Sequence, residues 1–172
     1  MNAAASTALK GGFLIGLANL AWLYVAYYLG LHTSGIWAFQ VFMLIWLAVS
    51  LTGYILALKA VRRRSERWGY WSGLRAGFLA AFVSMLMSVV AQAGYFKVVH
   101  PEWPEVMMGQ TRAHFAGQGM AAARVEQMVA QARAAFTLQN YALQSAFAAL
   151  FVGIVFSAII MIFLRRRKVA VG

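Results

Sequence analysis

Four long runs of apolar residues limit how this chain can fold more than any other feature. They cover residues 9–29, 36–58, 72–96 and 141–164. Each run is about as long as the roughly 20 helical residues that cross the hydrocarbon core of a bilayer. Lipid offers no hydrogen-bond partner to a backbone N–H or C=O, so each run is expected to be an α-helix. The sequence therefore predicts an all-α fold, a four-helix transmembrane bundle that forms one integral membrane domain over residues 1–172.

The composition agrees with a membrane protein and excludes some chemistry. Hydrophobic residues make up 63% of the chain and charged residues 11%, whereas soluble domains have about 45–50% and 25%. The absence of cysteine excludes disulfides and thiolate metal sites. A signal peptide is the alternative interpretation of the first run, but the run is long and no A-x-A-like cleavage site follows it.

Residues 98–138 form a long stretch that lipid could not hold, between the third and fourth runs. They carry three of the four acidic residues, two of the three histidines and both prolines. We predict an extracytoplasmic helical insertion here, with one helix over 104–115, a break at 117–119 and a second helix over 120–136. The alternative is an uninterrupted helix from residue 120 through residue 168.

The placement of positive charge predicts the orientation in the membrane. Eleven of the fifteen basic residues lie at the end of the spans that holds both termini, and four lie at the other end. The positive-inside rule then puts both termini in the cytoplasm and residues 98–138 outside. The same placement argues against a nucleic-acid partner, because the charge marks the ends of apolar runs. The basic residues assigned to setting this topology are Lys59, Arg62, Arg63, Arg64, Arg67, Arg165, Arg166, Arg167 and Lys168.

Small residues at four-residue spacing mark the faces on which the helices are expected to pack. In lipid, helices associate through close approach at small residues rather than through hydrophobicity. Packing inside the bundle is one interpretation, and docking of a partner subunit or a second copy is the other. The candidate helix-packing residues are Gly12, Gly16, Gly73, Gly77, Ala81, Ser145, Ala149, Gly153 and Ser157.

Residues 9–17 and 74–82 are a candidate internal repeat, with four identical positions. Each begins a run that is expected to leave the cytoplasm. The likeness suggests two parallel hairpin repeats about an axis normal to the membrane. The alternative is that any helix starting at the inner surface favours a basic residue, glycine and phenylalanine.

The second helix of the insertion is predicted to be amphipathic. Its apolar residues recur at helical spacing, and its charged residues lie largely off that stripe. It is expected to rest on the membrane surface, to cap the bundle or to receive a partner. The candidate partner surface consists of Val125, Met128, Val129 and Phe136.

Few residues suggest catalysis, metal binding or transport. His100, Glu102, Glu105 and His114 are the only metal-like group, and their spacing matches no recognised zinc motif. We therefore expect no metal, no cofactor and no enzyme activity.

The polar residues in the middle of the predicted spans are uncharged, whereas most ion pathways contain ionisable residues there. Three of them, Ser84, Ser88 and Gln92, share one face of the third run and suit interhelical hydrogen bonds better than a solute path.

The chain resembles a known family at several points. The segment Trp71-Ser72-Gly73-Leu74-Arg75-Ala76-Gly77-Phe78, then His100-Pro101-Glu102, and a fourth span ending in a basic tail look like the domain of unknown function DUF 4199. The likeness covers most of the chain, although the insertion here is richer in alanine and poorer in lysine and glutamate. The resemblance implies a four-span protein of the bacterial inner membrane, with no activity or catalytic residue to carry over.

These observations lead to two expectations about function. The first is a non-enzymatic accessory or scaffold subunit of a complex in the bacterial inner membrane. Its partners would be the lipid bilayer and either another membrane protein or a second copy of the chain. The alternative is a small-solute or ion transporter that acts as an oligomer.

Overall fold

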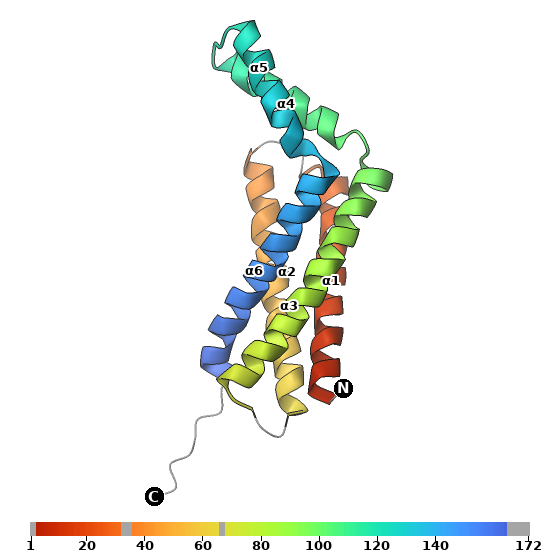
Figure 1. Cartoon of the computed structure of the whole chain (residues 1–172), viewed down its shortest axis with the longest axis vertical. Coiled ribbons are helices and arrows are strands. Elements are labelled where there is room, and N and C mark those ends of the chain that lie inside the picture. Colours follow the sequence, from red (N-terminus) through yellow and green to blue (C-terminus); the bar gives the residue numbers. More distant parts are fainter. Residues whose placement is uncertain (1–2, 32–35, 66–67, 165–172) are drawn as a thin grey trace, which may run out of the picture. The chain divides into compact units, whose positions relative to one another are not determined.

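A computed structural model describes residues 3–31, 36–65 and 68–164, and every regular element in these ranges is helical. Figure 1 shows the elements along the chain. The α-helices are α1 (Ala3–Tyr28), α2 (Ile36–Arg63), α3 (Tyr70–Gly94), α4 (Trp103–Gly117), α5 (Ala122–Arg133) and α6 (Leu138–Leu164). A π-helix, η1 (Tyr95–Val99), follows α3, and a 3₁₀ turn, η2 (Ala134–Phe136), precedes α6. The prediction of an all-α fold is confirmed.

Within the residues that the structure describes, four helices are long and apolar enough to cross a membrane: Ala3–Tyr28, Gln40–Arg63, Tyr70–Val99 and Leu138–Leu164. This confirms the four predicted spans. The helix ends differ from the apolar limits, because α1 begins at Ala3 rather than near residue 9 and α2 continues to Arg63 rather than ending near residue 58. Alanine, lysine and arginine are good helix formers, and basic side chains interact favourably with a helix C-terminus. The helices therefore continue after the apolar sequence stops.

The described residues group into two compact units. The bundle unit comprises those within Met1–Ser88 and Ala146–Gly172, and the insertion unit is Val89–Ser145. The boundaries fall inside α3 and α6, so each unit contains part of both helices. Each unit is described by itself below.

In the bundle unit, the start of α1, the end of α2, the start of α3 and the end of α6 lie at the same end (Figure 1). Two hydrogen bonds join these ends. The Arg64 guanidinium donates to Thr7 Oγ1 over 3.4 Å, and Trp68 Nε1 donates to the Leu164 carbonyl over 3.1 Å. The four helices therefore alternate in direction along the chain.

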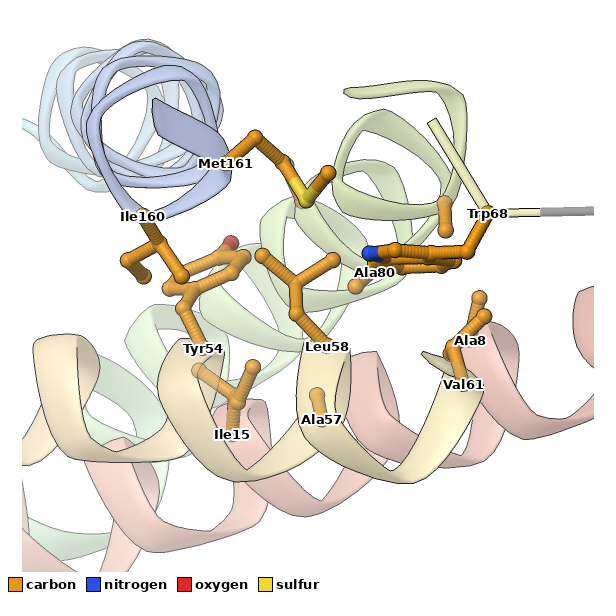
Figure 2. Close-up of a cluster of buried hydrophobic side chains, with 12 residues drawn as sticks. Ala8, Ile15, Tyr54, Ala57, Leu58, Val61, Trp68, Ala80, Ile160 and Met161 are labelled. Carbon is orange, nitrogen blue, oxygen red and sulfur yellow. The ribbon is translucent and has the colours of Figure 1, made fainter. Parts of the chain in front are cut away.

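The core of the bundle unit is made of a few large side chains among many alanines. Figure 2 shows Tyr54 and Leu58 of α2 pointing towards Met161 of α6. Alanine keeps neighbouring backbones close, which favours helix association in lipid. The buried cluster contains Ala8, Ile15, Tyr54, Ala57, Leu58, Val61, Trp68, Ala76, Ala80, Ala81, Ile160 and Met161.

Glycines of α1 lie against α3. A Cβ atom added to Gly12 would collide with the backbone of Ala80, and one added to Gly16 would collide with the Met87 side chain. The contact at Gly12 is the tighter constraint, because backbone atoms of a neighbouring helix cannot rotate away. Glycine at residue 12 therefore sets how closely α1 and α3 can approach.

Glycines of α3 lie against α6. A Cβ atom on Gly73 would meet the thioether of Met161, and one on Gly77 would meet the Ser157 side chain. On α6 itself, a Cβ atom on Gly153 would meet the Tyr54 hydroxyl. The structure thus places these small residues inside the bundle unit, at contacts between its own helices.

The candidate repeat is only partly reflected in these contacts. Residues 9–17 and 74–82 both belong to the first turns of helices that start at the same end of the bundle unit. Gly12 and Gly77 occupy equivalent positions in the repeat, but Gly12 contacts α3 whereas Gly77 contacts α6. A two-fold axis relating the two hairpins would have directed Gly77 towards α1, so the glycine contacts do not follow that symmetry.

Large apolar side chains cover the outside of the bundle unit. Phe163 is 80% exposed, Phe151 70% and Leu44 66%. Monomeric soluble proteins rarely expose apolar patches larger than a few hundred Å². Surfaces of this kind on four helices of spanning length are suited to contact with lipid.

The insertion unit contains the two predicted helices and the predicted break between them. Pro104 lies in the first turn of α4, and Gly119 has φ of +74°, a left-handed conformation that glycine adopts without strain. The alternative of one helix from residue 120 through residue 168 is wrong, because Thr137 is extended, with φ of −91° and ψ of 151°. Thr137 Oγ1 instead accepts a hydrogen bond from the Asn140 N–H over 3.3 Å and caps α6.

Alanine substitutions at three glycines test the importance of close helix approach. Gly12→Ala is expected to lower the free energy of unfolding by about 1–3 kcal/mol, because the Ala80 backbone cannot move away from the added methyl group. Gly73→Ala should cost less, since the Met161 thioether is flexible. Gly109→Ala, in α4 with no atom within 4 Å of the new methyl, should be neutral or stabilising by up to about 1 kcal/mol. The measurement is detergent-solubilised thermal unfolding followed by circular dichroism, and equal tolerance of Gly12→Ala and Gly109→Ala would contradict the packing argument.

Candidate functional site

The described basic residues of the bundle unit gather at the end where α1 starts. Lys10 lies near the start of α1, and Arg75 lies in the first turns of α3. The end of α2 contributes Lys59, Arg62 and Arg63, and Arg64 directly follows this helix. No aspartate or glutamate is present among the described residues of this unit. This end therefore presents positive charge without an acidic partner from the described part of the unit.

Several residues assigned to the topology lie outside the described residues. They are Arg67, Arg165, Arg166, Arg167 and Lys168, and the acidic Glu66 lies outside them as well. The part of the topology argument that rests on them stays a sequence-based prediction.

Buried and half-buried polar side chains of the bundle unit form hydrogen bonds between helices and within one helix. Asn19 Nδ2 donates to Ser50 Oγ over 3.0 Å, and Ser50 Oγ lies 3.3 Å from Asn19 Oδ1, which links α1 to α2. Ser157 Oγ donates to the Gly153 carbonyl over 2.6 Å within α6. Interhelical and back-bonded hydroxyls of this kind are typical of membrane helices.

The polar face predicted on α3 is divided between the two units. Ser84 is buried in the bundle unit, while Ser88 is half-buried and donates to the Met85 carbonyl over 2.7 Å. Gln92 belongs to the insertion unit and is half-buried. The Ser88 hydroxyl is thus bonded to its own helix, so Ser84 is the member of this face that the bundle encloses.

Aromatic side chains of the insertion unit form a cluster. The Tyr95 ring lies 6.0 Å from the Trp103 ring, and the Tyr141 ring lies 6.2 Å from Trp103 and 5.2 Å from Phe96. Tyr95, Phe96 and Trp103 are buried. These contacts join η1, the start of α4 and the start of α6. Edge-to-face ring pairs at such separations are favourable beyond the area that they bury.

The two histidines that the sequence suggested as possible metal ligands contact other side chains instead. Tyr95 Oη lies 3.3 Å from His100 Nδ1, and Gln118 Nε2 lies 3.0 Å from His114 Nε2. Glu102 and Glu105 are exposed. In the part of the chain that the structure describes, no three histidine, aspartate or glutamate side chains are grouped closely enough to hold a metal ion.

Helices α4 and α5 form a hairpin joined by an ion pair. Arg112 Nε donates to Glu126 Oε1 over 2.7 Å and Arg112 Nη2 donates to Glu126 Oε2 over 3.1 Å, a two-pronged contact. The hydrogen bond from Arg112 lowers the pKa of Glu126, and the hydrogen bond to Glu126 raises the pKa of Arg112. Both groups face solvent, so the pair is expected to orient the hairpin more than to stabilise it.

The residues of the candidate partner surface are buried or half-buried. Val125 and Val129 are buried, 4% and 5% exposed, and α5 packs against α4. Met128 and Phe136 are half-buried. The apolar stripe of α5 is therefore largely covered within the insertion unit. The exposed residues of α5 are mainly polar and include Arg124, Gln127, Gln131 and Arg133.

A family model described as protein of unknown function (DUF4199) matches residues 10–166 of the chain. The chain belongs to this family. The match extends from within α1 to just beyond α6 and so includes the hairpin. No curated protein and no solved structure matches the chain.

The segments that carry the family resemblance have structural roles in this member. Residues 71–78 form the first turns of α3, and Gly73 and Gly77 there contact α6. His100-Pro101-Glu102 connects η1 to α4, and the Trp103 N–H donates to the His100 carbonyl over 3.1 Å. Residues 71–78 thus take part in helix packing, and His100-Pro101-Glu102 forms a turn between two helical segments.

The sequence did not reveal the Arg112–Glu126 pair or the π-helix. The two charged residues lie on either side of a helix break, so their approach depends on the register of the hairpin. The π-helix has no composition signal, because Tyr95, Phe96 and Val98 would suit an α-helix equally well.

Neutralising Glu126 tests the role of the ion pair in the hairpin. Because the folded-state pKa of Glu126 is lowered, the stabilisation is present above the ordinary carboxyl pKa and is lost as pH falls through the lowered value. Protection factors of α4 and α5 amides, from hydrogen exchange corrected for intrinsic rate, should show this acidic step in the wild type and not in Glu126→Gln. Glu102→Gln, an exposed carboxylate outside the pair, is the control and should keep the step. An identical pH profile in wild type and Glu126→Gln would show that the pair is unimportant in solution.

Proposed function

We propose that this family member is a non-enzymatic accessory or scaffold subunit of a complex in the bacterial inner membrane, with both termini in the cytoplasm. The observation that carries the proposal is the interior of the bundle unit, which is filled by small and apolar side chains. Its buried polar residues within the described ranges are Ser50, Ser84 and Ser157, and none is charged. The orientation rests on the eleven basic residues at one end of the spans against four at the other.

Close packing supports a structural role for the bundle unit. Proton and ion pathways usually place ionisable residues within the spans. Here the contacts at Gly12, Gly77 and Gly153 bring helices together where a solute path would need space. A bundle of this type is suited to holding its helices in one arrangement.

The hairpin provides the surface through which a partner would bind. Its outer residues are exposed and polar, and its apolar stripe is already covered. Interfaces of non-obligate complexes are about as polar as the rest of a protein surface. A soluble segment of a neighbouring membrane protein is therefore the partner that this surface fits.

Co-purification in mild detergent tests the subunit proposal. The wild-type protein is expected to elute with a stoichiometric partner, and Arg124→Gln with Arg133→Gln should lower the retained partner roughly two- to tenfold, through loss of two surface charges. Lys59→Gln, an exposed charge of the bundle unit, is the matched control and should retain the partner. Elution as a lone monomer under several gentle conditions would refute the proposal.

An oligomeric transporter is the second candidate, and three polar residues favour it: Asn19, which is half-buried, and Ser50 and Ser84, which are buried. Each lies in the bundle unit, where a solute crossing the membrane would need polar contacts. Under the subunit proposal, the purified protein in liposomes should show solute and ion flux equal to that of protein-free liposomes. Saturable flux that Ser84→Leu lowers and Ala148→Leu leaves unchanged would replace the subunit proposal with the transporter.

A further inference from the structure

A groove of about 680 Å³ runs between α1 and α2 in the bundle unit. Gly11 and Ala18 line it from α1, and Ala48 and Thr52 line it from α2. Ala18, Ala48 and Thr52 are exposed, so the groove opens on the outside of the bundle, where α1 and α2 are expected to meet lipid. Small side chains on both walls leave a channel between the larger apolar residues of the two helices.

One end of the groove is basic. Thr7 and Lys10 line it there, and the Arg64 guanidinium donates to Thr7 Oγ1 over 3.4 Å. Thr7 Oγ1 donates in turn to the Ala3 carbonyl over 2.8 Å, which fixes the hydroxyl beside Arg64. The Lys10 ammonium of α1 and the guanidinium of Arg64, the residue that follows α2, thus lie at the end of an otherwise apolar channel.

This charge is not compensated by the described part of the bundle unit, which contains no acidic side chain. An anion that neutralises Lys10 and Arg64 must therefore come from outside those residues. Lys10 and Arg64 are exposed and belong to the end of the spans where basic residues meet the headgroup region. The anion that the membrane itself supplies at this depth is a lipid phosphate.

We propose that this groove binds an anionic phospholipid, with one acyl chain along the α1–α2 channel and the phosphate held by Lys10 and Arg64. The proposal goes beyond the subunit function, because it concerns a different surface and does not depend on a protein partner. Guanidinium and ammonium groups are the usual protein donors to phosphate. Each basic residue near an anionic membrane surface strengthens such binding about fivefold.

A second copy of the chain is the competing occupant, because small residues also favour helix docking. Two copies in one membrane have the same orientation, so a two-fold contact through this groove would place both basic ends at the same depth. Lys10 and Arg64 of one copy would then face the same charges of the other. Like charges at such a contact oppose association, whereas an anionic lipid neutralises them.

The test uses the full-length protein purified into nanodiscs that contain equal amounts of phosphatidylglycerol and phosphatidylcholine. Lipids that remain bound after transfer to mild detergent are counted by native mass spectrometry. The wild type is expected to retain phosphatidylglycerol preferentially. Lys10→Gln should reduce this preference about fivefold, while Arg75→Gln, an exposed charge at the same end but on α3, should leave it unchanged.

A second pair of variants tests the channel itself. Ala18→Phe fills the groove and should lower retention of both lipids, and Thr52→Phe should do the same from the opposite wall. Ala148→Phe adds the same bulk to an exposed residue of α6 and should retain lipid as the wild type does. Thermal unfolding of each variant shows whether the fold is kept.

Three outcomes would overturn the proposal. The first is equal lipid preference in Lys10→Gln and the wild type. The second is displacement of the lipid by millimolar glycerol phosphate alone, because a site for the phosphate group would not need the groove. The third is a dimer that Ala18→Phe dissociates without changing the retained lipid, which would assign the groove to a second copy.

Discussion

Close approach of helix backbones is the constraint on which the bundle unit depends. Lipid tails are as apolar as leucine, so burying leucine against leucine gives little net advantage over leaving it in the membrane. What distinguishes the associated state is atomic contact between helices and the hydrogen bonds between them. The contact of Gly12 with the Ala80 backbone and the Asn19–Ser50 bond supply both. The large apolar residues instead mostly face outward, as Phe151 and Phe163 do.

The two units differ in the charged side chains that they contain. The described acidic residues, Glu102, Glu105 and Glu126, all lie in the insertion unit, and the described part of the bundle unit carries only positive charge. The insertion unit can therefore satisfy its own charges, as Arg112 and Glu126 do. The bundle unit must satisfy its charges through water, lipid or a partner. This difference explains why a protein surface is proposed on one unit and a lipid site on the other.

The sequence predicted the spans and the two helices of the insertion well, for a physical reason. The length and apolarity of a segment determine whether it forms a membrane helix almost independently of tertiary structure. In the insertion, Pro104 favours the start of a helix and Gly119 favours a break, both through local backbone geometry. Contacts between segments were harder to predict. The covering of Val125 and Val129 depends on how α5 meets α4, and the α1–α2 groove depends on the distance between two helices. The glycine pattern indicated packing faces, but it did not indicate that Gly12 would contact α3 while Gly77 contacts α6.

The aromatic cluster has a consequence for how the protein is made. Tyr95, Phe96 and Trp103 are synthesised before the hairpin is complete, whereas Tyr141 belongs to the last spanning helix. The contacts between α4 and α5 are local and can form as soon as both helices leave the ribosome. The ring contact of Phe96 with Tyr141 can form only after residue 141 is made, whereas that of Tyr95 with Trp103 can form earlier. We therefore expect the insertion unit to assemble in two stages, the contacts between α4 and α5 first and those of Tyr141 later.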